Sequence, residues 1–358
     1  MEKRTYAVMG SGSAGHALAA ILSKTGHAVR MYDIDEEKIR ALDTKRAITC
    51  TGKMEGEYPI ELATRDPRTA IEGCDIIMIS ALTCHNPDIA RKVAPYIRPD
   101  QIVVLNPGAT CGALEFRNIL MENGVTQCPV IAETQDLICT CRSYSPGAVN
   151  FTGIKREIAL ATIPAAEAAN VAELLADFYP NFIPQKNVLY TSLGNLAPIN
   201  HPAPTVLNIT RVEEPGDFYY FREGFTPSIG KVVEAMDRER MDIAKAFGLD
   251  LISVKEWLNI TYQVEGANVF EAMRNTPAYT NVLGPTSLDN RYIFEDLPNG
   301  LVPMTMLGKV VGVPTPVMDS IVELVYVMTG VDYFRQGRTL ESLGLSGKSV
   351  EEIIDMIS

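Results

Sequence analysis

The chain has 358 residues, of which 46% are hydrophobic, and 44 acidic against 32 basic side chains give a formal net charge of −12. A chain of this length is longer than a typical domain with a single hydrophobic core, so we expect two domains. The acidic balance is unsuited to holding nucleic acid or anionic lipid, and no apolar run approaches the ~20 residues of a membrane span. Neither a nucleic acid nor a membrane is therefore an expected partner.

The amino-terminal residues and the cysteines predict a cytoplasmic protein. The opening MEKRTYAVMGSG has no apolar signal-peptide region followed by a cleavage site. The seven cysteines all lie between Cys50 and Cys141, and their odd number favours reduced thiols over a disulfide framework. Cys84 adjoins His85, but no second pair follows at metal-ligand spacing, so no metal site is predicted.

The first half of the chain alternates strand-like and helix-like segments. Short β-branched and apolar runs predict strands, and apolar residues at helical spacing between several of them predict helices. The predicted strands are residues 5–10, 27–33, 75–80, 101–108, 129–134, 137–142 and 156–162, and the predicted helices are 14–26, 35–43, 86–97 and 165–179. This alternation indicates βαβ units around a parallel sheet.

The pattern changes after Tyr179. Residues 180–187 predict a proline-bracketed connector, and a long amphipathic helix at 226–248 is expected to end at Gly248. Another helix follows, with Thr315 as candidate N-cap, Pro316 as its first residue and Gly330 as its end.

The predicted fold class follows from this change. It is α/β, with an N-terminal Rossmann dinucleotide-binding domain at 1–184 and an all-α C-terminal domain at 185–358.

The segment GSGSAG predicts a dinucleotide-binding loop. Gly10, Gly12 and Gly15 follow a predicted strand and open a predicted helix, which is the context that this motif requires. Gly10 permits a tight turn, Gly12 lets the backbone approach a pyrophosphate, and Gly15 lets the helix pack closely on the sheet. The other residues of the loop are Ser11, Ser13 and Ala14. We expect the helix N-terminus to present its N–H groups to the phosphates.

Asp33 ends the second predicted strand, 23 positions after Gly10. A carboxylate there suits the ribose hydroxyls of the adenosine and repels a 2′-phosphate, so NAD is favoured over NADP. The alternative is a glycine-rich turn followed by an acidic helix cap. Because strand, loop, helix, strand and acid stand in the expected order, dinucleotide binding is the stronger interpretation.

Two later loops are further candidates for cofactor contact. Ligands of such sheets lie beyond the carboxyl ends of the strands, which nominates Ser80 and Ala81 after one strand and Asn106 after the next. Ordinary strand-to-helix turns would explain the same residues, and both interpretations remain open.

Two segments of the second half are candidates for chemistry. His201, in GNLAPINHPAPTVLN, is the only histidine after His85, and it stands in a segment too proline-rich for an ordinary helix interior. Arg291 and Asp296 lie in RYIFEDLPNGLVP, a polar island in apolar sequence. The alternatives are a core histidine bonded to backbone and a solvated loop with a helix cap.

Five segments together resemble the opine dehydrogenases, the family that includes octopine and nopaline dehydrogenases. They are GSGSAG, IVVLNPGATCGALEF, AETQDLICTCR, GNLAPINHPAPTVLN and RYIFEDLPNGLVPMTMLGKVVGVPTP, and the last two are much more specific than the first. The likeness covers nearly the whole chain and implies a helical domain of the 6-phosphogluconate-dehydrogenase-like type. It also implies that His201 and Asp296 are catalytic and that Arg291 and Asn195 bind substrate, since Asn195 matches the asparagine ahead of the histidine in the family's motif.

The resemblance implies reversible reductive condensation of an α-amino acid with an α-keto acid, through an imine that NADH reduces. Two alternatives remain: a related dehydrogenase that reduces a keto or hydroxy acid without an amine, and a non-catalytic NAD-binding sensor. The expected partners are the small-molecule substrates, with a homodimer through the helical domain as one further option. The quoted motifs do not specify which amino acid and keto acid react.

Overall fold

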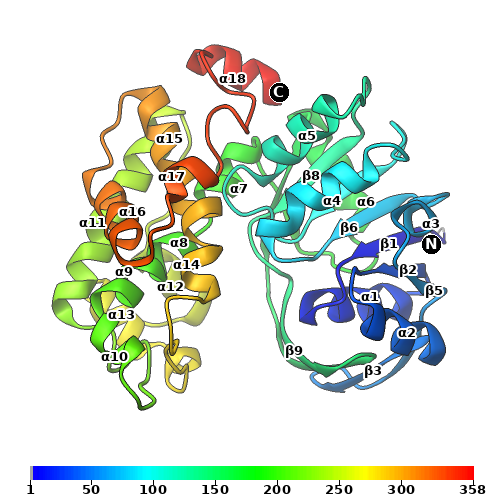
Figure 1. Cartoon of the computed structure of the whole chain (residues 1–358), viewed down its shortest axis with the longest axis horizontal. Coiled ribbons are helices and arrows are strands. Elements are labelled where there is room, and N and C mark those ends of the chain that lie inside the picture. The colour runs from blue at the N-terminus through cyan, green and yellow to red at the C-terminus, as the bar shows by residue number, and fades with distance from the viewer. Residues whose placement is uncertain (1–2) are drawn as a thin grey trace. The chain divides into compact units, whose positions relative to one another are not determined.

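The computed structural model describes residues 3–358, which form two compact units. The first unit extends to Ser192 and also takes in Ile354–Ser358, and the second unit is Leu193–Ile353. Figure 1 labels the helices and strands, and its colours run from blue at the N-terminus to red at the C-terminus. The strand-containing half and the helical half of the chain are therefore separate packing units.

The main sheet of the first unit has eight strands, in the order β12-β11-β8-β7-β6-β1-β2-β5. They are β1 (Thr5–Met9), β2 (Ala28–Tyr32), β5 (Leu62–Thr64), β6 (Ile76–Ile79), β7 (Ile102–Leu105), β8 (Val130–Thr134), β11 (Ile158–Ile163) and β12 (Phe182–Pro184). All neighbours pair in parallel except β8 and β11. The strand order reverses between β1 and β6, and this is the point where doubly wound sheets bind ligands. The predicted Rossmann fold is confirmed.

Helices lie between and after the strands of this unit. They are α1 (Ser13–Lys24), α2 (Glu36–Lys45), α3 (Pro67–Ile71), α4 (Asn86–Val93), α5 (Gly112–Glu122), α6 (Ala168–Leu175) and α7 (Val188–Leu193). The helices predicted at 14–26, 35–43 and 86–97 correspond to α1, α2 and α4. The helix predicted at 165–179 is shorter than expected: a 3-10 turn at Ala165–Glu167 precedes α6, and α6 ends at Leu175.

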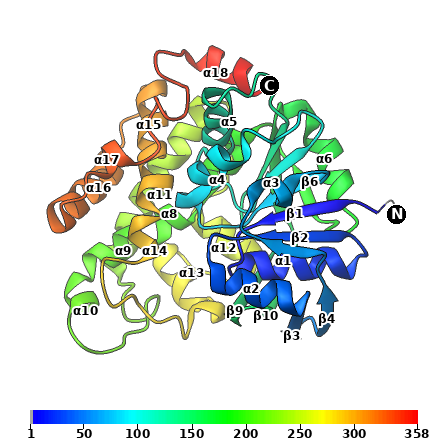
Figure 2. The ribbon, with the colours of Figure 1, turned by 45° about the vertical axis from the view of Figure 1, so that its right-hand side comes forward.

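A second sheet covers α1. It has four strands in the order β4-β3-β10-β9, namely β3 (Ala47–Gly52), β4 (Gly56–Pro59), β9 (Cys139–Ser145) and β10 (Ala148–Ile154). Figure 2 shows α1 between β1 and β2 on one side and these strands on the other. Residues Gly15 to Leu22 are consequently all buried, as expected for a helix covered on more than one side. The strand predicted at 137–142 belongs to this second sheet.

The prediction of a plain connector at 180–187 is wrong. Phe182–Pro184 forms β12, which pairs in parallel with β11 and buries Phe182. Two prolines near an edge strand leave this pairing intact, because an edge strand needs only part of its N–H groups for the ladder.

The second unit is helical. Its helices are α8 (Ala197–Asn200), α9 (Pro202–Leu207), α10 (Ile209–Glu213), α11 (Pro227–Ala246), α12 (Val254–Tyr262), α13 (Val269–Asn275), α14 (Arg291–Phe294), α15 (Val302–Val311), α16 (Pro316–Thr329) and α17 (Tyr333–Gln336), and α18 (Val350–Ile357) ends the chain. Between residues 193 and 353, β pairing is limited to one bridge between Tyr219 and Leu283. The predicted all-α character is confirmed.

Helix α16 begins and ends where predicted but is capped differently. Thr315 is its N-cap residue, yet the Thr315 side chain makes no capping hydrogen bond. The Glu239 carboxylate of α11 accepts the N–H groups of Val317 and Met318 instead, at 2.8 and 3.0 Å. Burial raises the pKa of Glu239, whereas these two hydrogen bonds lower it. A buried acid thus joins α11 to α16.

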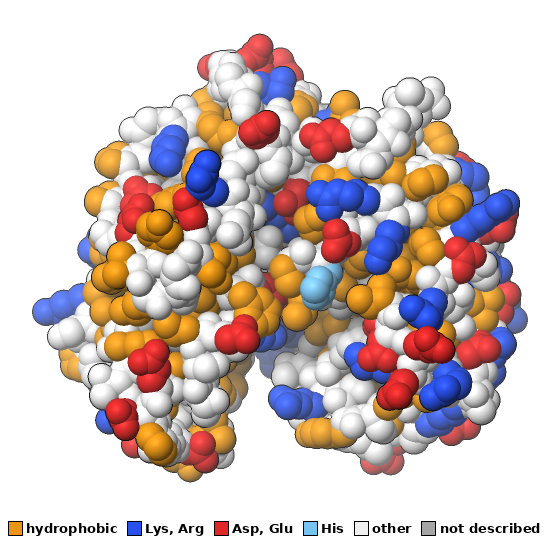
Figure 3. All heavy atoms as spheres, in the orientation of Figure 1, with side chains coloured by type: hydrophobic (Ala, Val, Ile, Leu, Met, Phe, Trp, Pro, Cys, Tyr) orange, Lys and Arg blue, Asp and Glu red, His pale blue; other side chains and the backbone are white. Residues whose placement is uncertain are grey.

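The surface has features that bear on the expected partners. No helix within residues 3–358 is both long and apolar enough to cross a membrane. On the face drawn in Figure 3, acidic and basic side chains are interspersed, and no continuous basic area is visible. The described residues also contain no cluster of three or more histidine, cysteine or acidic side chains that could hold a metal ion.

Candidate active site

Each glycine of the loop after β1 has a separate steric role. Gly10 has a φ of +114°, and a Cβ there would lie 2.8 Å from the Ala81 nitrogen. A Cβ on Gly15 would lie 1.9 Å from the Gly10 carbonyl oxygen, so only glycine fits. A Cβ on Gly12 would meet nothing within 4 Å. The first and third glycines are required by packing, and the space beside the second is open to a ligand.

The N-terminus of α1 fits a phosphate group. Gly12 is its N-cap residue and supplies no side chain to accept the N–H groups of the first turn. A helix of 12 residues concentrates partial positive charge at this end, and free N–H groups there suit an anion. The Ser13 hydroxyl accepts the Ser143 N–H at 2.9 Å, so its side chain is held by β9. The loop residues therefore fit a dinucleotide pyrophosphate.

Asp33 holds the glycine loop from the end of β2. Its carboxylate accepts the Ser11 N–H at 2.7 Å and the Ser11 hydroxyl at 2.6 Å, and its other oxygen accepts the Asp35 N–H at 3.1 Å. Burial raises the pKa of Asp33, but the hydrogen bonds from Ser11 and Asp35 outweigh it and leave the pKa below its usual value. Asp33 is thus a charged acceptor next to the loop.

The other cofactor candidates lie around the same loop. The Ser80 hydroxyl donates to the carbonyl oxygens of Met9 and Gly10 at 3.2 and 3.1 Å, and Ala81 packs against Gly10. Asn106 is buried after β7; its amide donates to the Val104 carbonyl at 2.9 Å, and its Oδ1 has no hydrogen-bond partner among the described residues. Ser80 and Ala81 support the loop, and Asn106 has a buried acceptor without a partner among the described residues.

Sequence reasoning missed His16 in this site. The buried imidazole contacts the Gly12 carbonyl through Nδ1 and accepts the Gly147 N–H at Nε2, both at 2.9 Å. Since Nε2 accepts, the proton is on Nδ1 and the ring is neutral. Burial lowers the pKa of His16, and the hydrogen bond to Gly12 partly opposes this. His16 joins the glycine loop to the β9–β10 turn, and no local sequence signal marks that contact.

In the second unit, His201 and Asp296 form a hydrogen-bonded pair. Nδ1 of His201 lies 2.7 Å from Oδ2 of Asp296, and the two side chains are 19% and 7% exposed. A carboxylate only accepts, so Nδ1 carries the proton and Nε2 presents its lone pair. His201 stands between the short helices α8 and α9, whose prolines Pro198 and Pro202 lie near their first positions. The pair has the arrangement of a general base and its orienting acid.

The remaining predicted residues lie near this pair in sequence and make other contacts. The Arg291 side chain is 60% exposed, and its Nε lies 3.5 Å from Glu295. Arg291 therefore pairs with Glu295, and it is Asp296 that pairs with the histidine. The Asn195 Oδ1 accepts the Ala197 N–H at 3.3 Å and supports the start of α8.

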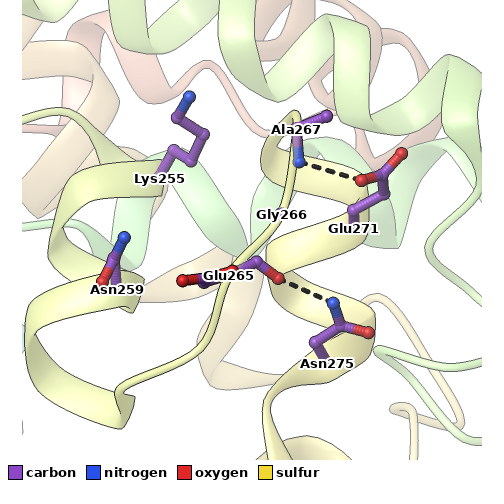
Figure 4. Close-up of a pocket in the computed structure, with 7 residues that line it drawn as sticks. All are labelled: Lys255, Asn259, Glu265, Gly266, Ala267, Glu271 and Asn275. Carbon is purple, nitrogen blue, oxygen red and sulfur yellow. Dashed lines mark hydrogen bonds between the residues drawn. The ribbon is translucent and has the colours of Figure 1, made fainter.

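A surface hollow in the second unit contains none of these residues. Figure 4 shows it between α12, α13 and their connection. It is lined by Lys255, Asn259, Glu265, Gly266, Ala267, Glu271 and Asn275. The Glu271 carboxylate accepts the Ala267 N–H and the Asn275 amide donates to the Glu265 carbonyl, so two of its polar groups serve local structure.

Comparisons with known proteins give the same picture for both halves of the chain. Residues 184–329 match the family model of the NAD/NADP octopine/nopaline dehydrogenase alpha-helical domain, and residues 5–120 match that of the NAD-dependent glycerol-3-phosphate dehydrogenase N-terminus. The opine dehydrogenase of Arthrobacter sp. (strain 1C) is 43% identical over 348 residues, which cover 97% of each chain.

Two solved structures share the fold. Octopine dehydrogenase with NADH and L-arginine has a TM-score of 0.83 at 19% identity, covering 98% of each chain. Yersinopine dehydrogenase with NADP+ bound has a TM-score of 0.75 at 16% identity, covering 99% of this chain and 97% of the other.

The Rossmann unit and the matches to two families of NAD-dependent dehydrogenases place the chain among the NAD-binding oxidoreductases. Within that class, the chain belongs to the opine dehydrogenase family, whose members act on CH–NH groups. The resemblance inferred from the sequence motifs is confirmed.

Proposed function

We propose that this enzyme condenses an α-amino acid with an α-keto acid, with His201 as the proton carrier, Arg291 as a substrate clamp and NADH as the preferred reductant. The 2.7 Å contact between His201 and Asp296 is the observation that carries the proposal. An oriented imidazole with its Nε2 lone pair available is the group that proton transfer near neutral pH requires.

The proposed chemistry assigns each step to a group. His201 Nε2 takes a proton from the ammonium group of the amino acid, because only the free amine attacks the keto carbon. The amine adds to the keto carbon and forms a C–N bond. The hydroxyl of the resulting carbinolamine leaves as water with the proton that His201 returns, and a protonated imine results. When bound, the nicotinamide supplies the hydride that reduces this imine to a secondary amine. Asp296 holds the imidazole in one tautomer and stabilises its charged form.

Arg291 is proposed to bind a substrate carboxylate. A guanidinium presents paired N–H donors that match the two oxygens of a carboxylate. The Arg291 side chain is 60% exposed, and its Nε lies 3.5 Å from the Glu295 carboxylate, which makes a weak ion pair. A substrate carboxylate can therefore replace Glu295 as the partner of Arg291. Asn195, which supports α8, is proposed to act in substrate binding through the segment that carries His201.

We propose that residues 1–184 bind the cofactor and 185–358 the substrate. The open Gly12, the bare N-terminus of α1 and the charged Asp33 support the first assignment. The Asn106 Oδ1, as an unpaired acceptor beyond β7, suits the carboxamide of a nicotinamide. Asp33 supports NAD over NADP because it would repel a 2′-phosphate, although yersinopine dehydrogenase of the same fold binds NADP+.

A homodimer through the helical unit and a cytoplasmic location complete the proposal. Leu324, Val327 and Met328 of α16 are 42%, 80% and 42% exposed, and their spacing places them on one helix face. Sedimentation of the native enzyme should give a dimer, and Val327→Glu should shift it toward a monomer. A native monomer at all concentrations would contradict this part. The seven cysteines, all thiols, support a reducing compartment.

The test of the function is NADH oxidation with a panel of keto acids, including pyruvate, with and without amino acids. Turnover should require both substrates and yield a secondary amine. Turnover with the keto acid alone would favour an enzyme that reduces keto acids without an amine. NADH binding with no turnover across the panel would favour a sensor.

A further inference from the structure

The imidazole of His201 lies against an aromatic ring as well as against Asp296. The ring of Tyr292 stacks on it with centroids 4.1 Å apart and an angle of 23° between the planes. Tyr292 begins the turn that ends at Asp296, four positions later, so one short segment supplies both contacts. Asp296 restrains the imidazole within its plane, and Tyr292 restrains it from above the plane.

The backbone of the segment that carries Tyr292 and Asp296 brings both side chains to the imidazole. Asn290 caps α14, with its Oδ1 accepting the Tyr292 N–H at 3.0 Å. The Asp296 N–H donates to the Arg291 carbonyl five residues back, at 3.2 Å, and the π-helical segment Leu297–Leu301 follows. Wide turns of this kind are frequent at functional sites, because they re-aim side chains from a helix.

The backbone of His201 is restrained from the other side. The Thr205 hydroxyl donates to the His201 carbonyl at 2.8 Å, and the Tyr220 hydroxyl also lies against that carbonyl, at 2.5 Å. The Tyr220 ring lies 5.2 Å from the Tyr292 ring, so the aromatic pair forms one wall. The His201 carbonyl, the Nδ1 edge of its ring and one ring face are thus all in contact, which restricts the imidazole.

We propose that Tyr292 is a positioning residue for proton transfer, whose ring face orients the His201 imidazole and stabilises its protonated form. This rests on the proposed role of His201. A neutral aromatic face attracts a cation held close above it, so the stack favours the imidazolium state. Burial raises the pKa of the Tyr292 phenol, Arg291 opposes this and Asp296 adds to it, so the ring stays neutral.

The ionisable groups around the imidazole are few. Asp296 and Tyr292 contact the ring, Tyr220 contacts the His201 backbone, and Arg291 pairs with Glu295 beside them. Burial raises the pKa of Tyr220 well above its usual value, so it too stays neutral. Asp296 is therefore the charged partner of the imidazole, and Tyr292 is the neutral group on its ring face.

The experiment compares three variants. Tyr292→Phe keeps the ring face, Tyr292→Leu removes it, and Tyr279→Leu is the matched control. Tyr279 stacks on Phe221 at 4.3 Å and 21°, with no histidine involved. For each protein, kcat, the Michaelis constants, the pH profile of kcat/KM and the NMR titration midpoint of His201 are measured. The His201 resonance is identified by its loss in His201→Asn.

Tyr292→Leu should lower kcat about 3–30-fold and move the His201 midpoint down by about half to one pH unit, with the acidic limb of the profile following. NADH affinity should stay native. Tyr292→Phe and Tyr279→Leu should match the native enzyme. If Tyr292→Leu does not fold, Tyr292→Met makes the same test.

Two results would overturn the proposal in different ways. An unchanged His201 midpoint in a folded Tyr292→Leu protein would show that the stack does not act on the imidazole. A lowered midpoint with native kcat would confirm the contact but reject its use in catalysis, whereas loss of the proton-carrier role itself would show only as near-native turnover in His201→Asn.

Discussion

His201 Nδ1 and Asp296 Oδ2 lie 2.7 Å apart although 95 positions separate them in the chain. The histidine stands between two short helices that each have a proline in the first two positions, and the acid stands where α14 passes into a π-helical segment. This contact turns an isolated imidazole into one with a defined tautomer. Asp296 and Arg291 lie close together in the chain but differ in their contacts, because Asp296 faces the histidine while Arg291 remains exposed.

Arg291→Lys should raise the Michaelis constant of a carboxylate substrate about tenfold while changing kcat little. Lysine keeps the charge but loses the paired donors that hold two oxygens, and a charge-assisted hydrogen bond is worth about that factor. Steady-state kinetics with each substrate varied in turn makes the measurement. Arg335→Lys, an exposed arginine of the same unit, is the control. Native constants for both substrates in Arg291→Lys would remove Arg291 from the site.

Asp33→Ser should weaken NADH use and improve NADPH use relative to it, because the charge that repels a 2′-phosphate is gone. Serine also gives up the two hydrogen bonds from Ser11. Asp33→Asn is therefore the matched variant, since its amide oxygen still accepts the Ser11 N–H while the charge is removed. Both variants should shift the ratio of kcat/KM values toward NADPH. A native enzyme that already prefers NADPH would show that the role given to Asp33 is wrong.

His16 should make the first unit sensitive to mild acid. Its pKa in the folded protein is lowered from 6.5, chiefly by burial, so the unfolded chain takes up a proton at a higher pH than the folded one. Stability from this group is complete above pH 6.5 and is lost as the pH falls below that value toward the folded pKa. Protonated Nε2 also could not accept the Gly147 N–H.

The check is the thermal midpoint measured from pH 7.5 to 5 for three proteins. His16→Gln should lose less stability on acidification than the native enzyme, whereas His85→Gln, at an exposed histidine, should follow the native slope. Parallel slopes in native and His16→Gln proteins would contradict this role.

Local patterns were sufficient to predict much of the fold. The apolar strand at Ile76–Ile79 and the glycine loop are readable because each carries its signal within a few residues. The second sheet was not predicted apart from β9. Its ladder pairs Thr49 with Ala148, and such distant partners leave no periodic mark in short, half-exposed strands.

Sequence patterns were likewise insufficient to predict several contacts of the helical unit and of the candidate site. Thr315 has the sequence of an N-cap, but Glu239, far back in the chain, supplies the cap because packing brings α11 to α16. The spacing of residues gave no reason to pair His201 with Asp296, and only the family resemblance brought them together. Tyr292 lies within RYIFEDLPNGLVP and His16 directly follows GSGSAG, but no pattern of residues signals their roles, which arise from a stack and from a buried hydrogen bond.

The most direct measurement is the turnover of His201→Asn together with its affinity for NADH. If His201 is the proton carrier, kcat should fall about 10²–10⁴-fold, while the NADH dissociation constant stays native, because the glycine loop and Asp33 are unchanged. Asp296→Asn should cause a smaller loss, and the double variant should lose less than the two effects combined, as for residues that act as a unit. A folded His201→Asn protein with near-native turnover would contradict the account and leave His201 as a structural histidine.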